Sequence, residues 1–405
     1  MSAVHFTNVD SPRQFNRSLI LKEIRQNGPI TKIDLAERYD LTFTAVGNIV
    51  FDLSEAGIVE KAGYGESSGG RPPVLYQIKW DSVYVVALVI GVKGMTVSLV
   101  NLKGEVRDES TSHVESHLFV DKAYELIDHL LAETPIDTQK IAGICVTAPG
   151  PLDVTDGRLL SPPNLSGVHN LDIREMIEKR YGWTTILEKD ANAFALAEQW
   201  FGHVKPNENI LYIYNDQGLG SGMIIDSHIH RGFGNGAGEI GHMVIDIDGP
   251  KCSCGNYGCL ETLSSGIAVE RRVKEEIRRG YPSTLAHGYL HDEKEPTIDM
   301  IVKEARQGDA LSIQVLKEAE RYLGLGIANA INLFSPNQIV FGGQLTRLYP
   351  EMIEGAEKVA KARAFSPISK KVIFTASAFN NQSTTIGAAA VIQQKWFDES
   401  GGIIA

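Results

Sequence analysis

The chain has 405 residues, with 39 Lys and Arg against 50 Asp and Glu and a formal net charge of −11. This acidic balance argues against a protein that coats nucleic acid through its general charge. The length exceeds what one ordinary hydrophobic core holds, so two or three domains are expected. Residues 1–80 carry nine basic and nine acidic side chains, which leaves the whole acidic excess to the remainder.

Nothing in the sequence predicts export or a membrane partner. The first residues lack a basic stretch followed by an apolar one. The longest apolar run, Val83 to Val92, is much shorter than the ~20 residues of a membrane-spanning helix. Cys145 lies alone in the apolar run Ile141–Val146, as an inert core thiol does. We therefore expect a cytoplasmic protein in a reducing compartment.

The segment 13–57 has the pattern of three short helices. A helical pattern from Phe15 ends at Asn27-Gly28-Pro29. Thr31 is expected to cap a second helix, with Asp34 completing a capping box, and Thr42 to cap a third. The third helix repeats apolar residues at the spacing of one buried face: Val46, Ile49, Val50 and Leu53. This order predicts a helix-turn-helix.

The start of the third helix is predicted to read bases of double-stranded operator DNA. Its outward residues are Phe43, Thr44, Ala45, Gly47 and Asn48, and the small ones among them let the helix approach base edges. Asn48 can pair with adenine, and the methyl groups of Thr44 and Ala45 can touch thymine. Two β-prone pieces, 58–62 and 74–78, predict a wing, from which Arg71 would enter the minor groove. The alternative is a three-helix protein-docking module, with Arg71 on a solvated turn.

Beyond Trp80-Asp81 the sequence predicts two α/β units. With the head in residues 1–80, we expect a first lobe in 81–200 and a second in 201–405. Strands are expected at 84–91, 95–101, 105–110, 141–146, 185–187, 210–214, 338–341 and 371–375, with a hairpin from 214 to Ile229. Helices are expected at 122–132, 171–181, from 191, at 267–279, 298–307 and 310–333, after 341 to about 363, and from 385.

Three of the four cysteines fall within eight residues, and a histidine lies ten residues ahead of the first. The candidate metal ligands are His242, Cys252, Cys254 and Cys259. One imidazole and three thiolates make a closed tetrahedral set, which is typical of structural Zn²⁺ because no position remains for a reactive water. The alternative is a cluster of free thiols, and the spacing favours the metal. Glu239 and Glu261 bracket this segment.

The run from Gly238 to Thr262 resembles the signature of the ROK family, which is named after repressors, unassigned reading frames and sugar kinases. The resemblance implies an actin-like (ribonuclease-H-like) ATPase and sugar-kinase fold of two lobes beyond residue 80. The winged helix-turn-helix resembles the repressor branch of that family. The overall pattern, including Lys-Cys-Ser-Cys-Gly-Asn-x-Gly-Cys, is most similar to xylose repressors of Gram-positive bacteria.

The resemblance also implies a monosaccharide in a cleft between the lobes. In the family the matching histidine binds zinc and touches the sugar, and both matching glutamates contact sugar hydroxyls. The family's Glu-Asn-Asp-Ala-Asn run, which holds a general base, is here Glu188–Asn192, so Asp190 is present and Lys189 replaces Asn. Without the resemblance, Asp190 would be a helix N-cap. The implied sugar-contacting residues are Asn164, Lys189, Asp190, Glu239, His242 and Glu261.

Two loops that handle phosphate in ROK kinases differ in this chain. Where kinases carry Asp-Ile-Gly-Gly-Thr-Lys, this chain has Val89–Gly94, and Gly-Thr-Gly-x-Gly is replaced by Asp216–Gly220. Phosphoryl transfer depends on positioning and charge neutralisation, so the absence of the acid and the added carboxylate should greatly impair catalysis. We therefore predict no catalytic residues and no enzyme activity.

These patterns predict a DNA-binding repressor of carbohydrate-utilisation genes, induced by a monosaccharide of the xylose or glucose type and containing structural Zn²⁺. One helix-turn-helix reads few bases, so a homodimer or a dimer of dimers on a roughly palindromic operator is expected. Two alternatives stay open. An active ROK sugar kinase with a DNA-binding head predicts intact phosphate loops, and a repressor controlled by a partner protein predicts a decayed sugar pocket.

Overall fold

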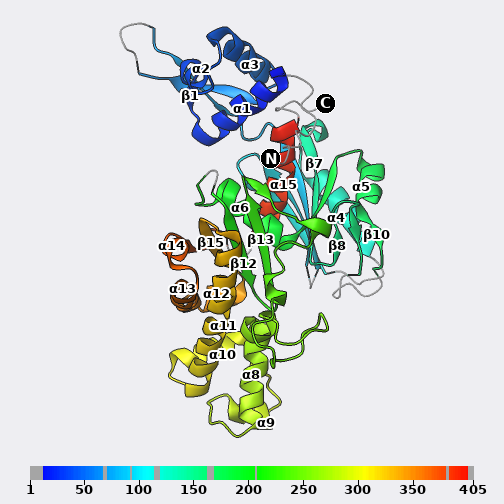
Figure 1. The fold of residues 1–405 in the computed structure, drawn as a ribbon. Helices are drawn as coiled ribbons and strands as arrows, with labels where there is room; N and C mark the ends of the chain where they lie inside the picture. Colours follow the sequence, from blue (N-terminus) through cyan, green and yellow to red (C-terminus); the bar gives the residue numbers. More distant parts are fainter. Residues whose placement is uncertain are drawn as a thin grey trace. The chain divides into compact units, whose positions relative to one another are not determined.

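The computed structural model describes residues 12–66, 71–91, 94–113, 119–161, 168–205, 208–379 and 383–399 (Figure 1). Contacts divide the chain into two compact units. The first takes in the chain up to Lys189 and again from Ala388 onward, and the second is Asp190–Gly387. The domain boundaries expected at residues 80 and 200 stay a prediction. Within the described ranges, no helix combines the length and the apolar character that crossing a membrane requires.

A winged helix-turn-helix opens the first unit, as predicted. Its elements are α1 (Pro12–Asn27), β1 (Ile30–Thr31), α2 (Lys32–Arg38), α3 (Phe43–Glu55), β2 (Val59–Tyr64) and β3 (Val74–Ile78). Thr31 and Asp34 form the expected capping box, and the Thr42 hydroxyl accepts a hydrogen bond from the Ala45 N–H at 3.2 Å. The apolar face of α3 is buried. The three strands pair in the order β1-β3-β2, and β2 and β3 correspond to the two pieces of the predicted wing.

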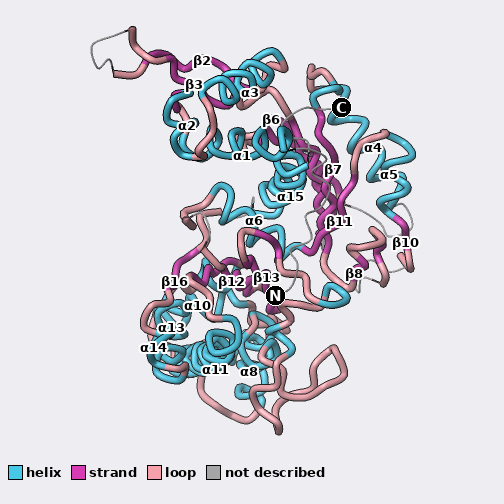
Figure 2. Tube along the Cα trace, turned by 45° about the horizontal axis from the view of Figure 1, so that its top comes forward, coloured by secondary structure: helices cyan, strands magenta, loops and turns pink. Residues whose placement is uncertain are grey.

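The rest of the first unit is built on a mixed five-stranded sheet (Figure 2). Its strands are β4 (Tyr84–Gly91), β5 (Gly94–Asn101), β6 (Val106–Ser112), β7 (Ile141–Ala148) and β11 (Thr185–Lys189). They lie in the order β11-β7-β4-β5-β6, with β4, β5 and β6 antiparallel and β4, β7 and β11 parallel. Helices α4 (Phe119–Glu133) and α5 (Ile173–Tyr181) pack their apolar residues into one core with the sheet.

One small sheet was not predicted. It consists of the two-residue strands β8 (Leu152–Asp153), β9 (Arg158–Leu159) and β10 (Leu171–Asp172), in the order β10-β9-β8. The helix expected from residue 171 therefore begins at Ile173. Asp172 ends β10 and also caps α5, because its carboxylate accepts the Glu175 N–H at 3.1 Å.

The second unit has its own five-stranded sheet. Its strands are β12 (Ile210–Asn215), β13 (Leu219–Ile225), β14 (His228–Ile229), β15 (Gln338–Gly342) and β16 (Ile373–Ala376), in the order β14-β13-β12-β15-β16. Its α-helices are α6 (Asp190–Phe201), α7 (Glu261–Ser264), α8 (Gly266–Arg278), α9 (Ala286–His291), α10 (Ile298–Arg306), α11 (Ala310–Phe334), α12 (Gln344–Leu348), α13 (Glu351–Arg363) and α14 (Ser366–Ser369). Two short 3₁₀ turns are η3 (Phe233–Asn235) and η4 (Ile240–His242).

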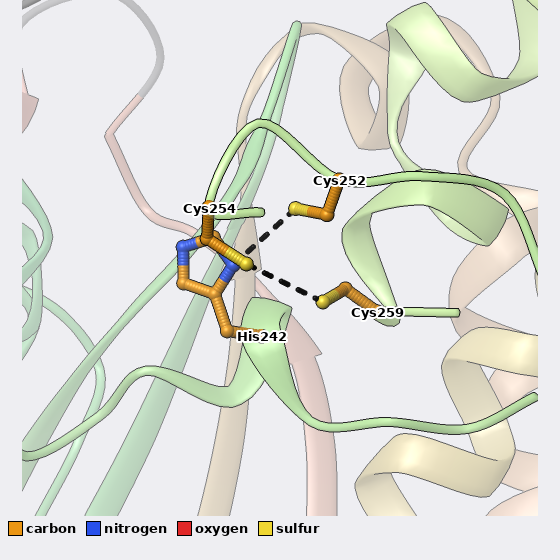
Figure 3. A group of neighbouring side chains, drawn as sticks. All are labelled: His242, Cys252, Cys254 and Cys259. Atoms are coloured by element: carbon orange, nitrogen blue, oxygen red, sulfur yellow. Dashed lines mark hydrogen bonds between the residues drawn. The ribbon is translucent and has the colours of Figure 1, made fainter. Parts of the chain in front are cut away.

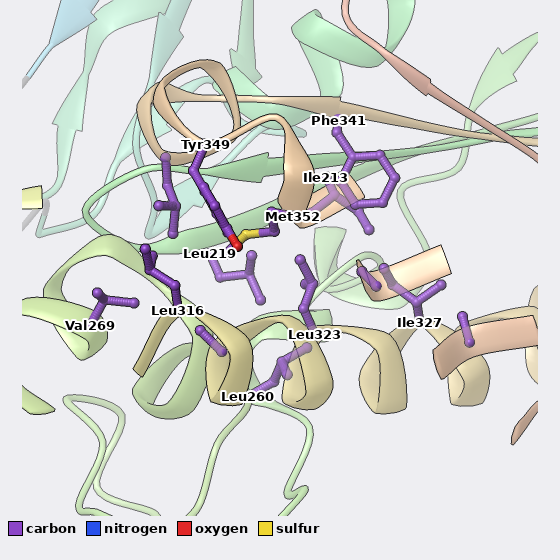
Figure 4. Packing of buried hydrophobic residues seen from close by; sticks show 14 of the residues in the cluster. Ile213, Leu219, Leu260, Val269, Leu316, Leu323, Ile327, Phe341, Tyr349 and Met352 are labelled. Carbon is purple, nitrogen blue, oxygen red and sulfur yellow. The ribbon is translucent and has the colours of Figure 1, made fainter. Parts of the chain in front are cut away.

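Helix α11 is the centre of the core of this unit. Its Leu316, Leu323 and Ile327 pack with Ile213 and Phe341 of the sheet (Figure 4). All five side chains are buried. The single helix expected after β15 is interrupted between α12 and α13, where a proline precedes the second helix and cannot donate a backbone hydrogen bond.

The last helix, α15 (Ser383–Glu399), belongs to the first unit from Ala388 onward. Its final turn contacts α1. The Ser18 hydroxyl donates to the Phe397 carbonyl at 2.6 Å, and the Arg25 guanidinium lies 5.8 Å from the centroid of the Phe397 ring. The last carbonyls of a helix lack partners within it, so α1 supplies a donor that the end of α15 needs. Burial lowers the pKa of Arg25 to about 10.

Candidate functional site

The predicted metal ligands lie on one folded loop and one short helical turn of the second unit. Cys252 and Cys254 belong to a tight turn in which the Gly255 N–H donates to the Cys252 carbonyl at 3.0 Å. Cys259 lies on the returning segment, where it pairs with Val244 in an antiparallel bridge. The turn and the bridge bring the three thiols together opposite the histidine at the end of η4 (Figure 3).

The four candidate ligand atoms all lie within 4.8 Å of one another. Cys252 Sγ is 3.6 Å from His242 Nδ1, and Cys254 Sγ is 3.8 Å from Cys259 Sγ. A tetrahedral zinc ion, with Zn–S near 2.3 Å and Zn–N near 2.1 Å, places two sulfurs about 3.8 Å apart and sulfur and nitrogen about 3.6 Å apart. These side chains therefore fit zinc as they stand. Four protein ligands leave no position for water, which is the arrangement of a structural site.

The thiols of this cluster differ in acidity. Burial raises the pKa of Cys259 to about 12, and the neighbouring thiols add to that shift. The backbone of Asn256 hydrogen-bonds Cys254 and lowers the pKa of that thiol. Because a metal binds thiolates rather than thiols, uptake by this cluster releases protons and becomes tighter as the pH rises.

Strand β13 supports the predicted sugar-contacting acids through backbone contacts. Glu261 Oε2 accepts the Leu219 N–H at 3.0 Å. Gly238, which precedes Glu239, packs on Ser221, where an added Cβ would lie 2.9 Å from the carbonyl oxygen. The Ser221 hydroxyl donates to the Gly238 carbonyl. Both acids are thus held by segments that rest on the first half of one strand.

Helix α6 packs on the same strand. A Cβ at Gly222 would lie 2.6 Å from the Ala191 carbonyl carbon, so strand and helix meet backbone to backbone. Asp190 is the first residue of α6, and its Oδ1 accepts the N–H of the next residue, Ala191, at 2.6 Å. Lys189 belongs to the other compact unit. Asn164 lies outside the described residues.

His242 can serve the metal and a ligand at once. Its Nδ1 faces Cys252, so Nε2, on the far edge of the ring, is directed away from the thiols (Figure 3). Gly241 packs against the Leu219 backbone of β13 and holds this turn in place. A metal on Nδ1 would fix the direction in which Nε2 points.

A carboxylate occupies the turn between β12 and β13. Asp216 accepts the Tyr214 hydroxyl at 2.8 Å and the Gln217 N–H at 2.8 Å. Burial raises the pKa of Tyr214, and the nearby charge of Asp216 adds to the shift. The tyrosine therefore stays a neutral donor, and the carboxylate is held in this turn.

The same carboxylate lines a cavity of about 570 Å³ within the second unit. Phe194 and Tyr214 form one wall, with ring centroids 4.6 Å apart. Gly342 and Arg347 lie on another. This volume suits a small molecule. Asp216 gives the wall a negative charge that a polyphosphate would meet.

The predicted DNA-reading residues lie on the surface of α3. Phe43, Thr44 and Asn48 are exposed, and Ala45 is half-buried. Arg71 is exposed where the wing resumes before β3. The sequence interpretation missed Phe51, whose side chain is 61% exposed on the same helix. The signal was available, because residue 51 falls outside the 46, 49, 50 and 53 spacing of the buried face.

Comparison with known proteins agrees with this architecture. A ROK family model matches residues 85–395, and a model of winged helix-turn-helix DNA-binding domains matches residues 16–60. The chain belongs to the ROK family. This ROK protein is 28% identical over 389 residues to the xylose repressor of Bacillus subtilis strain 168, which covers 95% of this chain and 97% of the relative. It is 29% identical over 394 residues to the DNA-binding transcriptional dual regulator NagC of Escherichia coli K12, which covers 96% of this chain and 94% of that relative.

Solved structures show the same fold. A ROK family transcriptional regulator described as a homologue of the Escherichia coli MLC protein superposes with a TM-score of 0.83 at 30% identity, covering 96% of this chain and 97% of that one. The ROK hexokinase of Thermus thermophilus superposes with a TM-score of 0.65 at 24% identity, covering 78% of this chain and 100% of the hexokinase. The likeness to this kinase concerns the fold.

Proposed function

We propose that this ROK protein is a sugar-responsive transcriptional repressor of carbohydrate-utilisation genes that acts in the cytoplasm. The observation that carries the proposal is a combination within one chain. An exposed recognition helix in a winged head accompanies a Cys₃His cluster, and the acids beside that cluster rest on one strand. The names of two relatives, a xylose repressor and the regulator NagC, support the same role.

In this proposal Asp190, Glu239, His242 and Glu261 hold the hydroxyls of a monosaccharide of the xylose or glucose type. Asn164 and Lys189 belong to the proposed contact set through the family resemblance. A site built from polar groups rejects a sugar that lacks a hydroxyl, because the protein group opposite is then left unpaired. A zinc ion on the Cys₃His set would hold His242 and the adjoining Glu261 segment in position and take no part in chemistry.

The sugar is bound and not phosphorylated. Support comes from Asp216, a fixed carboxylate in the turn that carries phosphate-binding backbone in the kinases. Val89, on β4, replaces the acid of the family's first phosphate loop. Without a positioned and charge-neutralised γ-phosphate, Asp190 has nothing towards which to direct a hydroxyl.

Sugar binding would release DNA by favouring one conformation of a homodimer or a dimer of dimers. The bound form would hold the two heads at a separation that does not match the operator half-sites. Such a shift requires the sugar to bind the released form more tightly than the DNA-bound form. Operator affinity in the presence of sugar is therefore the quantity that tests the mechanism.

The test selects duplexes from a random pool with the full-length protein and then titrates the bound complex with a panel of monosaccharides. We expect a roughly palindromic operator, and release by one sugar or a small group that also raises the unfolding temperature. An operator complex that no monosaccharide releases would refute the sugar-inducer proposal. If the protein forms sugar phosphate from ATP and Mg²⁺ at ~1 s⁻¹ or faster, the proposal that it binds sugar without phosphorylating it is wrong, and the kinase alternative is favoured.

A further inference from the structure

Helix α3 presents an outward face that the predicted contact set covers only in part. Val46, Ile49, Val50 and Leu53 form the buried face. At about 100° per residue, the opposite side carries Thr44, Asn48 and Phe51, with Gly47 at its edge and the exposed Glu55 one turn beyond Phe51. The reading surface therefore extends one turn past Asn48 and ends before an acidic residue.

Gly47 lies in the middle of this helix, and no residue that the structure describes requires a glycine there. It lies inside α3, and an added Cβ would meet no atom within 4 Å. Glycine weakens a helix interior relative to alanine because it has more backbone freedom to lose. A residue that costs stability and relieves no crowding within the protein indicates a surface outside the protein that needs the room.

Phe51 is the second unusual residue, because it leaves a large apolar side chain in water. Its side chain is 61% exposed, and the next residue is the acidic Asp52. The charge of Asp52 is offset by Arg13 of α1 at 2.7 Å, so the acid next to Phe51 is paired within the head. Residues four apart lie on one side of a helix and about 6 Å apart along its axis, so Gly47 and Phe51 are neighbours.

We propose that Gly47 and Phe51 together read the 5-methyl group of one thymine per half-site in the major groove. This inference rests on the proposed binding of operator DNA by α3. Gly47 would let the backbone approach the base edges, and the Phe51 ring would contact the methyl group, one of the apolar contacts that distinguish thymine in this groove. Asn48, between them in the sequence, would read an adjacent base edge.

The decisive experiment replaces each operator thymine in turn by uracil, which keeps base pairing and removes only the methyl group. The duplex is the one that the full-length protein selects from a random pool. At one thymine per half-site, the wild-type protein should lose about four-fold in affinity, the value expected for one buried carbon. Phe51→Ala should bind the unmodified operator more weakly and show no further loss at that same position.

Substituting larger side chains at Gly47 gives a second test, because operator affinity would not change if Gly47 had only a structural role. Gly47→Ala should slow amide hydrogen exchange in α3 and yet weaken operator binding about tenfold, the size of one disturbed base-pair contact. Gly47→Gln should weaken it further. The matched control is Gly288→Ala in α9, where a Cβ meets only Lys294 at 3.9 Å and where operator affinity should be unchanged.

The outcomes separate this inference from the function on which it rests. If no duplex is selected by the wild-type protein, DNA binding itself fails. If an operator is selected but wild type and Phe51→Ala lose the same affinity at every thymine replaced by uracil, Gly47 and Phe51 do not read a methyl group. The repressor proposal then stands. Full operator affinity in Gly47→Gln would likewise overturn the close approach of the helix.

Discussion

Gly258 determines whether the metal loop can close, and Gly258→Ala should abolish zinc binding. Its φ is +64°, a left-handed conformation that favours glycine. An added Cβ would lie 2.5 Å from the Asp246 carbonyl carbon and overlap the carbonyl oxygen, whereas ordinary contacts begin at 3.4 Å. The shortfall at the carbonyl carbon alone is about 0.9 Å, and the overlapping oxygen lies closer still, so the two segments would have to separate by more than about 1 Å.

Three hydrogen bonds set the size of the effect. The Gly258 carbonyl accepts from the Ile245 N–H at 2.9 Å and the Asp246 N–H at 3.3 Å, and the Gly258 N–H donates to the Pro250 carbonyl at 2.8 Å. At about 1 kcal/mol each, their loss costs about 3 kcal/mol. The left-handed backbone adds about 1–2 kcal/mol. Because Cys259 is the next residue, its sulfur would also shift by far more than the ~0.2 Å that metal-ligand distances tolerate.

Gly255→Ala is the matched control. Gly255 also has a positive φ, +93°, but a Cβ there would meet no atom within 4 Å. This variant should lose only the backbone cost of about 1–2 kcal/mol and keep its zinc. Metal content per protein chain and the unfolding temperature of both variants are the measurements. Full zinc occupancy in Gly258→Ala, or equal metal loss in the two variants, would refute the reasoning.

The remaining predictions concern DNA, sugar and the terminal helix. Asn48→Ala should cost about 1–3 kcal/mol of binding free energy at one operator position. Arg71→Ala should weaken operator binding and relax a preference for A·T-rich flanks. If both variants bind the operator like the wild-type protein, the reading surface lies elsewhere. Glu261→Gln keeps an acceptor oxygen for β13 but loses the charge, so sugar affinity should fall about tenfold or more while zinc content stays constant; unchanged affinity contradicts the sugar contact. Phe397→Ala empties a fully buried site and should cost about 3–5 kcal/mol in chemical denaturation, with weakened operator binding; a stability within 1 kcal/mol of wild type would show that the contact with α1 is dispensable.

Features that depend on neighbouring residues were predictable from the sequence. The capping box of Thr31 and Asp34 follows from a three-residue spacing, and the structure confirms it. The buried face of α3 follows from helical periodicity. The metal cluster was predictable for a similar reason. Three of its ligands lie within eight residues, so the loop that joins them has few ways to close.

Features that depend on distant residues were missed. Ser18 and Phe397 are 379 positions apart, and neither residue carries a local signal of the hydrogen bond between them. Strands β8, β9 and β10 have two residues each, too few for an alternating pattern to emerge. The contacts of Gly238 and Gly222 with neighbouring segments likewise come from packing, so the sequence named the acids beside β13 without naming the strand that supports them.

The turn at Asp216 carries groups that oppose the binding of a polyphosphate in this unit. A helix N-terminus ordinarily offers free N–H groups to an anion. Here the first N–H groups of α8 are already used: Gly266 donates to the Asp216 carbonyl at 2.7 Å and Ile267 to the Gln217 carbonyl at 3.3 Å. The Asp216 carboxylate, held by Tyr214, adds negative charge at the same turn. Backbone donors satisfied within the protein and a fixed carboxylate both oppose a polyphosphate, whereas neither affects the acids that rest on β13.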